Sequence, residues 1–301
     1  MDALRCLNVG QLEIAVRIWN PDAPHTVIAW HGLARHGGDF EQLARALGPE
    51  WRVLAPDTPG RGLSSWSFYP SREYLYRHYK VVATAVMDDF QLDSVPWIGT
   101  SMGGLLGMLL ASDDETASRI HCLVLNDVGP ELEPKALMQM ATYFSTMKRF
   151  TTFEALQAAL KENYQGFGIR QEAEWLDMAY SSARRLPDGA WTFHYDPRIS
   201  EQFIHDTPRD TWADWKNIRC PLMLVRGESS PLLSAQSVTK MQTLQPDMVV
   251  LEAAGCGHAP MLNVPHQIDP IRRFLEQSVP AARRPWWRTM LERLKVSIQG
   301  I

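Results

Sequence analysis

The sequence predicts an α/β protein with a mostly parallel central sheet flanked by helices and interrupted after strand six by a helical insertion. Short apolar runs alternate with amphipathic stretches through the first half of the chain, which is the pattern of strands covered by helices. This alternation stops over residues 130–215 and resumes after them. At about 150 residues per domain, length alone would allow two domains. The resumed alternation favours one sheet domain with an insertion.

Six strands are expected before the insertion and two after it. The first two form an N-terminal hairpin, and the next four are apolar through their interior positions, as strands buried on both faces of a sheet are. The expected strands are Leu4–Val9, Leu12–Ile18, Thr26–Trp30, Arg52–Ala55, Ser94–Gly99, His121–Asn126, Pro221–Val225 and Met248–Glu252. The helices expected between them are Phe40–Leu47, Tyr74–Phe90, Met102–Ala111, Ser234–Leu244 and Gln267–Ser278.

The insertion divides the chain into four parts. Residues 1–129 and 216–278 form the core, and residues 130–215 show helical periodicity without a convincing buried strand. The insertion also holds four tryptophans, which are Trp175, Trp191, Trp212 and Trp215. The remaining residues, 279–301, differ in character and form a separate basic segment.

Within this last part, residues 285–298 predict an amphipathic helix. One face carries large apolar side chains. Counting Arg283 and Arg284, which directly precede it, five basic residues against one acidic residue give a local charge of 5 − 1 = +4. A terminal helix packed on its own domain or on a dimer mate explains this pattern most simply. Contact with a membrane surface is the alternative. The chain could therefore be a monomer or a homodimer.

Composition excludes several classes of function. Thirty Lys and Arg against 34 Asp and Glu give a net charge of −4, so the basic excess typical of nucleic-acid binding is absent. No apolar run approaches the roughly 18 residues needed to span a bilayer or resembles a signal-peptide core. No CxxC spacing relates the cysteines, which are Cys6, Cys122, Cys220 and Cys256, so we expect neither a disulfide framework nor a zinc site. We expect a cytoplasmic protein, and nothing in the sequence implies a metal or an organic cofactor.

The strongest chemical signal is Gly99-Thr100-Ser101-Met102-Gly103, a G-x-S-x-G pattern between a strand and a helix. Small residues two positions before and after the serine permit a sharp strand-to-helix turn, because a larger side chain there would clash with neighbouring backbone. The turn places the hydroxyl at a helix N-terminus. Ser101 is therefore the expected nucleophile.

Two loops supply partners for this serine. The backbone amides of Leu33, in the loop after the third strand, and of Met102 are the expected oxyanion hole. His258 lies on the Gly-rich loop Gly255–Pro260 after the last strand, and imidazole is the side chain suited to act as general base near neutral pH. His31 follows its strand directly and is interpreted as fixing the loop.

These segments together resemble the α/β-hydrolase fold superfamily, in the group with a helical cap between strands six and seven. The resemblance covers the chain up to about Ser278. It rests on His31-Gly32-Leu33, Asp57-Thr58-Pro59-Gly60-Arg61-Gly62, Gly99–Gly103, Asn126-Asp127-Val128-Gly129-Pro130 and Gly257-His258-Ala259-Pro260. It implies that residues 130–215 form a cap and that Asp57 is structural, holding a turn.

The chain departs from the family pattern at the third member of the triad. The acid usually follows strand seven, but Ser230 and Pro231 stand there, and neither is a carboxylate. Asp127, at the end of strand six, is the favoured substitute because some superfamily members take the acid from that strand. Glu228 is the alternative, since its longer side chain could reach His258 from the usual strand.

The resemblance implies a serine hydrolase that cleaves carboxylic esters or lactones of small to medium, apolar substrates through an acyl-enzyme. Hydrolysis of a carbon–carbon bond in ring-cleavage diketones is an alternative that uses the same groups. A non-catalytic ligand-binding protein is a third possibility, motivated by the missing acid near Pro231. The cap side chains that could line an apolar pocket are Met138, Met140, Tyr143, Phe144, Met147 and Phe150.

Overall fold

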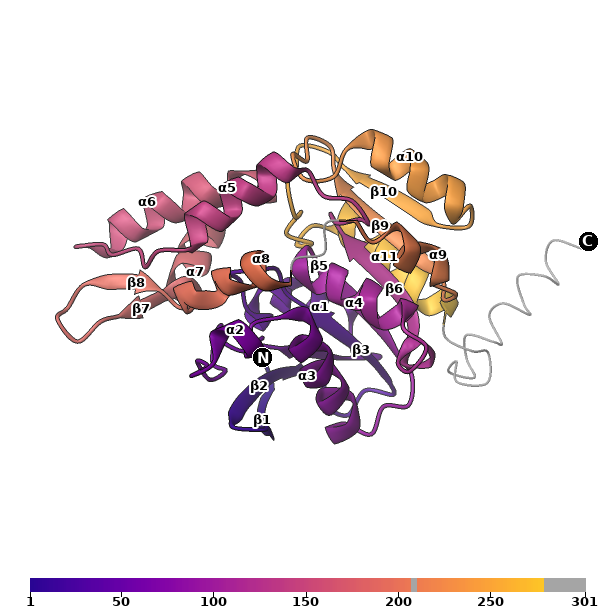
Figure 1. Ribbon diagram of the computed structural model, residues 1–301, viewed down its shortest axis with the longest axis horizontal. Helices are drawn as coiled ribbons and strands as arrows, with labels where there is room; N and C mark the ends of the chain where they lie inside the picture. Colours follow the sequence, from indigo (N-terminus) through magenta and orange to yellow (C-terminus); the bar gives the residue numbers. More distant parts are fainter. Residues whose placement is uncertain (207–209, 279–301) are drawn as a thin grey trace, which may run out of the picture.

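A computed structural model of the chain describes residues 1–206 and 210–278 (Figure 1). An eight-stranded sheet forms its centre, in the order β1-β2-β4-β3-β5-β6-β9-β10. Strand β2 runs antiparallel to β1 and β4, and every other neighbouring pair is parallel. The strands are β1 (Ala3–Val9), β2 (Leu12–Trp19), β3 (His25–Trp30), β4 (Trp51–Pro56), β5 (Val95–Thr100), β6 (Ile120–Asn126), β9 (Leu222–Gly227) and β10 (Val249–Ala253). The predicted fold class is confirmed, and each predicted strand forms with its ends shifted by at most two residues.

Helices cover both faces of the sheet and bury two separate apolar clusters. On one face, α1 (Glu41–Leu47) and α11 (Pro265–Ser278) pack their apolar sides against strand residues such as Val53 and Val225. The other face is covered by α3 (Tyr76–Asp89), α4 (Met102–Ser112) and α10 (Ala235–Leu244). Side chains on both surfaces of the sheet are thereby removed from water, which explains the continuous apolar runs of the central strands.

One predicted helix begins two residues later than expected and follows a short helix that was not predicted. The helix predicted over Tyr74–Phe90 forms as α3 (Tyr76–Asp89), and the additional short helix α2 (Pro70–Glu73) precedes it. Leu75 has extended backbone angles of φ −120° and ψ 152°, which interrupt the helical path. The hydroxyl of Tyr74 bonds to the amide of Ser67 and to Asp196, so this residue serves a tertiary contact that a local pattern cannot reveal.

Between β6 and β9 lies an inserted segment that is mostly helical. Its elements are α5 (Pro134–Phe144), α6 (Phe153–Tyr164), α7 (Glu172–Ser182), β7 (Ala183–Arg185), β8 (Trp191–Phe193), α8 (Glu201–His205) and α9 (Trp212–Asn217). The two strands pair antiparallel and were not expected from the sequence, because three residues are too short for an alternating pattern to be recognised. The predicted boundary after residue 215 falls inside α9.

The inserted segment packs on the core through backbone hydrogen bonds. The amide of Asp196 donates to the carbonyl of Gly60 at 2.8 Å, and that of Gly257 donates to Gly166 at 2.7 Å. Gly60 and Gly257 belong to loops that follow β4 and β10. Helices α5 to α8 therefore lie beside the carboxyl ends of the strands (Figure 1), which is where α/β sheets bind ligands.

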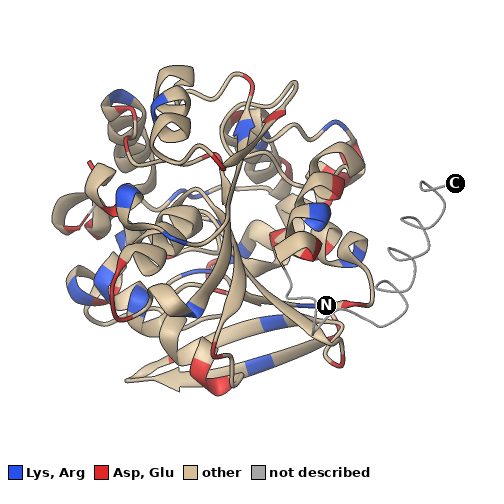
Figure 2. Cartoon of the chain, turned by 90° about the vertical axis from the view of Figure 1, so that its right-hand side faces the viewer, with Lys and Arg blue, Asp and Glu red and all other residues tan. Residues whose placement is uncertain are grey.

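Figure 2 shows basic and acidic residues interspersed over one face of the molecule. No helix within residues 1–206 and 210–278 has the length and apolar character needed to cross a membrane. The amphipathic segment predicted at 285–298, together with its proposed dimer or membrane contact, lies outside the described residues.

Candidate active site

Ser101 occupies a tight turn between β5 and α4. Its backbone has φ +49° and ψ −111°, in the left-handed half of the map that a residue with a side chain seldom adopts. A Cβ atom on Gly103 would lie 2.2 Å from the carbonyl oxygen of Trp30, and one on Gly99 would lie 2.3 Å from the oxygen of Gly103. Both flanking glycines are thus required by close backbone approach, as the sequence pattern predicts.

His258 lies within hydrogen-bonding distance of this serine. Its Nε2 is 2.9 Å from Ser101 Oγ. The histidine loop is held against the core by Gly227, where a Cβ would lie only 1.8 Å from the carbonyl oxygen of Gly257. Ser101 is buried, and the His258 side chain is 20% exposed. The pair therefore stands at the wall of a cavity rather than inside the core.

Asp127 directly follows β6, and its carboxylate accepts a hydrogen bond from the other ring nitrogen of His258. Its Oδ2 lies 2.7 Å from His258 Nδ1 and accepts hydrogen bonds from the Ser230 hydroxyl at 2.7 Å and the Ala259 amide at 3.2 Å. Its Oδ1 accepts from the Gly227 amide at 2.9 Å. Because the carboxylate is fully buried, these donors replace the water it would otherwise bind.

The structure places the alternative acid elsewhere. The carboxylate of Glu228 accepts a hydrogen bond from the Gly255 amide at 2.8 Å and makes no described contact with His258. Its length, which motivated the alternative, lets it reach the amide of Gly255 in the histidine loop instead of His258. The hydroxyl of Ser230 stands where the family resemblance places an acid, and it donates to Asp127. The contact between Ser230 and Asp127 was not expected from the sequence. The only signal for it was a hydroxyl at the position where the family usually has the acid.

The two backbone amides predicted for the oxyanion hole belong to α4 and to the loop after β3. Met102 is the first residue of α4, so its N–H lies at the open helix N-terminus. Leu33 is buried in the loop after β3, where a Cβ on the preceding Gly32 would lie 3.7 Å from Ser101 Cβ. Neither amide donates a hydrogen bond to another described group. Their role as oxyanion donors stays a prediction.

Ser101 and His258 open into a cavity of about 550 Å³ between core and inserted segment. Of the six apolar side chains that the sequence suggested for its wall, three line it; Met138 and Met147 are exposed. Lining residues from the inserted segment include Met140, Tyr143, Phe144, Asn163, Tyr164 and Phe167.

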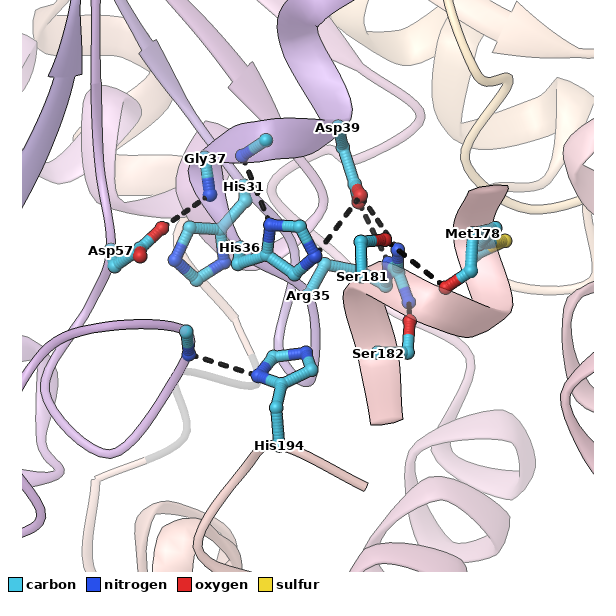
Figure 3. A network of polar contacts seen from close by, with 12 residues as sticks. His31, Arg35, His36, Gly37, Asp39, Asp57, Met178, Ser181, Ser182 and His194 are labelled. Atoms are coloured by element: carbon cyan, nitrogen blue, oxygen red, sulfur yellow. Dashed lines mark hydrogen bonds and ion pairs between the residues drawn. The ribbon is translucent and has the colours of Figure 1, made fainter. Parts of the chain in front are cut away.

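Arg35 is the one lysine, arginine or acidic residue among the described lining residues. Its Nε and Nη2 bond to the carboxylate of Asp39 at 2.7 and 2.6 Å, and its Nη1 donates to Ser182 at 2.7 Å. The guanidinium is therefore already neutralised before a ligand binds (Figure 3). The cavity wall carries no uncompensated fixed charge.

A group of buried histidines lies next to Arg35, as Figure 3 shows. Burial lowers the pKa of His31 to about 3, and its Nε2 accepts a hydrogen bond from the Thr58 amide at 2.9 Å. His31 thus fixes its loop, as predicted. His36 and His194 meet edge to face with ring centroids 4.8 Å apart. Burial, together with the nearby Arg35, lowers the pKa of both well below the usual value.

These two histidines join the core to the inserted segment in their neutral form. The Nδ1 atoms accept hydrogen bonds from backbone amides, from Gly38 to His36 at 3.0 Å and from Gly62 to His194 at 2.9 Å. Protonation would remove each acceptor and place positive charge beside Arg35. Asp39, whose Oδ1 lies 3.9 Å from His36 Nε2, is the opposing charge.

We expect the free energy of unfolding to fall as the pH drops below about 6.5, because the unfolded chain then binds protons that the buried histidines do not. The loss approaches about 1.4 kcal/mol per pH unit for each histidine. Urea denaturation of the wild type and of His194→Asn at several pH values measures it. The variant keeps an acceptor for Gly62 and should show a shallower slope. His205→Gln, at an exposed histidine, should match the wild type; equal slopes for all three would refute this origin of the acid sensitivity.

A mostly parallel sheet of this strand order, with a serine at a strand-to-helix turn beside a histidine loop, defines the class of α/β hydrolases. Residues 25–265 match the alpha/beta hydrolase fold family, and the chain belongs to it. It is 34% identical over 277 residues to the 3-hydroxybutyrate-oligomer hydrolase of Cupriavidus necator, covering 88% of this chain and 94% of that protein.

Other relatives agree with this class. An esterase of Mycobacterium tuberculosis is 26% identical over 227 residues, which span 74% of this chain and 72% of that protein. The structure of an alpha/beta hydrolase from Novosphingobium aromaticivorans superposes with a TM-score of 0.82 at 33% identity, covering 92% of this chain and 98% of that one. Because these relatives are hydrolases and esterases, they support ester hydrolysis in general.

Proposed function

We propose that the protein is a serine hydrolase that cleaves carboxylic esters, including lactones, through an acyl-enzyme. The observation that carries this proposal is the position of His258 between Ser101 and Asp127, at 2.9 and 2.7 Å from its two ring nitrogens. An imidazole held in this way can accept a proton at Nε2 while its Nδ1–H remains bonded to the carboxylate.

In this mechanism, His258 Nε2 takes the proton of Ser101 as the serine oxygen attacks the ester carbonyl carbon. The carbonyl oxygen becomes negative and accepts hydrogen bonds from the amides of Leu33 and Met102. The intermediate collapses when His258 returns the proton to the departing alcohol oxygen, leaving Ser101 acylated. Water then attacks by the same sequence, with His258 as base, and releases the acid.

The cavity favours an uncharged substrate. Its wall is largely apolar, and its arginine is already paired with Asp39, so a charged acyl group would lose its hydration without gaining a partner. The inserted segment supplies much of this wall and would act as the specificity-determining cap. Together with the relative that hydrolyses 3-hydroxybutyrate oligomers, this supports neutral esters of short acyl or hydroxyacyl groups.

The geometry of the site bears differently on the two alternative functions, ligand binding without catalysis and carbon–carbon bond hydrolysis. The non-catalytic interpretation depended on a missing acid, and a buried carboxylate now stands at His258 Nδ1. Carbon–carbon bond hydrolysis would use the same three side chains, so a substrate comparison must distinguish it.

A matched substrate panel tests the proposal. We expect turnover of p-nitrophenyl butyrate and of 3-hydroxybutyrate oligomers. The value of kcat/KM for p-nitrophenyl butyrate should exceed that for the p-nitrophenyl monoester of glutaric acid by about tenfold or more, because only the latter buries a carboxylate. A vinylogous ring-cleavage diketone serves as the competing substrate. Faster hydrolysis of the diketone, or no ester turnover, would contradict the proposal.

A further inference from the structure

Arg61 is a fully buried arginine that the mechanism above does not use. Its Nε donates to the Leu33 carbonyl at 2.8 Å, and its Nη1 donates to the Pro59 carbonyl and the Tyr79 hydroxyl, each at 2.7 Å. Its Nη2 lies 3.5 Å from the sulfur of Met102. Within residues 1–206 and 210–278, no carboxylate oxygen lies within 4 Å of a nitrogen of this guanidinium, so Arg61 forms no ion pair there.

Burying a cation without an anionic partner is costly. Neutral groups offset part of this cost, since the guanidinium carbon lies 5.6 and 5.3 Å from the ring centroids of Tyr74 and Tyr79, and carbonyl oxygens face its N–H groups. Guanidinium groups remain protonated in proteins at ordinary pH. The protein thus maintains a permanent positive charge at this place without a matching negative one.

The Arg61 guanidinium lies behind the proposed oxyanion hole and does not line the cavity. Arg61 touches both residues whose amides form that site, Leu33 through its carbonyl and Met102 through its side chain. Backbone N and O of one residue are at most about 3.6 Å apart, so Leu33 N lies within about 6.5 Å of Arg61 Nε. A substrate oxygen about 3 Å beyond Leu33 N would feel this charge through buried protein, where water screens it little.

We propose that Arg61 is a positioning residue for the oxyanion hole: it anchors Leu33 and Met102, and its charge favours the negative oxygen of the tetrahedral intermediate. The inference rests on the proposed function. A charge at this distance favours the intermediate over the neutral ester, so its removal should reduce kcat and leave KM nearly unchanged.

The test compares Arg61→Met, which keeps the length of the stem and removes the charge, with Arg61→Lys, which keeps the charge. With p-nitrophenyl butyrate, we expect kcat to fall about 20-fold in Arg61→Met with KM within about twofold, and to be largely retained in Arg61→Lys. Arg119→Met is the matched control, because Arg119 also donates to a carbonyl, that of Leu92, far from the site. Its kinetics should equal those of the wild type.

Equilibrium binding of an alkyl trifluoromethyl ketone gives a second readout that needs no turnover. Ser101 Oγ adds to the ketone carbon, its proton passes to His258, and the ketone oxygen becomes the anion. We expect affinity to fall by the same factor as kcat in Arg61→Met and to be restored in Arg61→Lys. If Arg61→Met does not fold, as judged by circular dichroism, Arg61→Gln replaces it.

The outcomes separate the two proposals. Absence of ester turnover in the wild type would refute the proposed function, whereas the ketone series would still report on Arg61. Equal losses in the charge-keeping and neutral variants, or a change confined to KM, would overturn the role of the Arg61 charge.

Discussion

Replacing Asp127 by Asn is expected to lower kcat for ester hydrolysis by about 10³- to 10⁴-fold with little change in KM. The carboxylate accepts four hydrogen bonds in the fold, one of them from His258 Nδ1 at 2.7 Å. A neutral amide cannot stabilise the imidazolium that forms as Ser101 attacks, and its NH₂ group would face donors. Steady-state kinetics with p-nitrophenyl butyrate measures the loss.

Glu228→Gln is the matched control for this prediction. It makes the same chemical change at the carboxylate that the sequence left as the alternative acid. Because Glu228 bonds to the Gly255 amide and not to His258, we expect kcat within about threefold of the wild type. A larger loss in Glu228→Gln than in Asp127→Asn would refute the assignment of the acid.

Replacing Ser101 by Ala should remove at least about 10⁴-fold of kcat while leaving ester binding nearly intact. The substitution deletes the nucleophilic oxygen 2.9 Å from His258 Nε2 and leaves the backbone turn in place. Kinetics measure the loss, and calorimetric binding of a slowly hydrolysed ester shows that the cavity persists.

The double variant Ser101→Ala/Asp127→Asn provides the sharper comparison. If Ser101, His258 and Asp127 act as a unit, the double variant should be no slower than Ser101→Ala alone, because the acid serves only a serine that is no longer there. Losses that multiply would indicate that Asp127 supports folding or binding independently of the serine.

Much of the site can be predicted from the order of the strands along the sequence. Parallel strands end at one edge of a sheet, so residues that follow strands, such as Ser101 and Asp127, meet although they lie far apart in sequence. The glycines around Ser101 also carry a local signal, since close backbone approach forbids a side chain there. Both the strand order and these glycines can be recognised in the sequence alone.

The remaining features depend on distances that a sequence does not contain. The geometry that separates Asp127 from Glu228 exists only in the folded chain, where the Gly255 amide holds Glu228. The β7–β8 hairpin was missed because its strands are three residues long. The sequence around Arg61 indicates a turn and gives no sign of a buried side chain. Arg61 comes to lie beside Leu33 and Met102 only when β3, β4 and α4 assemble.

The central claim is that Ser101 is acylated during ester hydrolysis. Incubation with a fluorophosphonate, followed by intact mass spectrometry and peptide mapping, tests it most directly. We predict one adduct per chain, located on Ser101, with the rate of labelling strongly reduced in Asp127→Asn and unchanged in Glu228→Gln. An ester-hydrolysing protein that remains unlabelled, or carries its adduct on another residue, would contradict the claim.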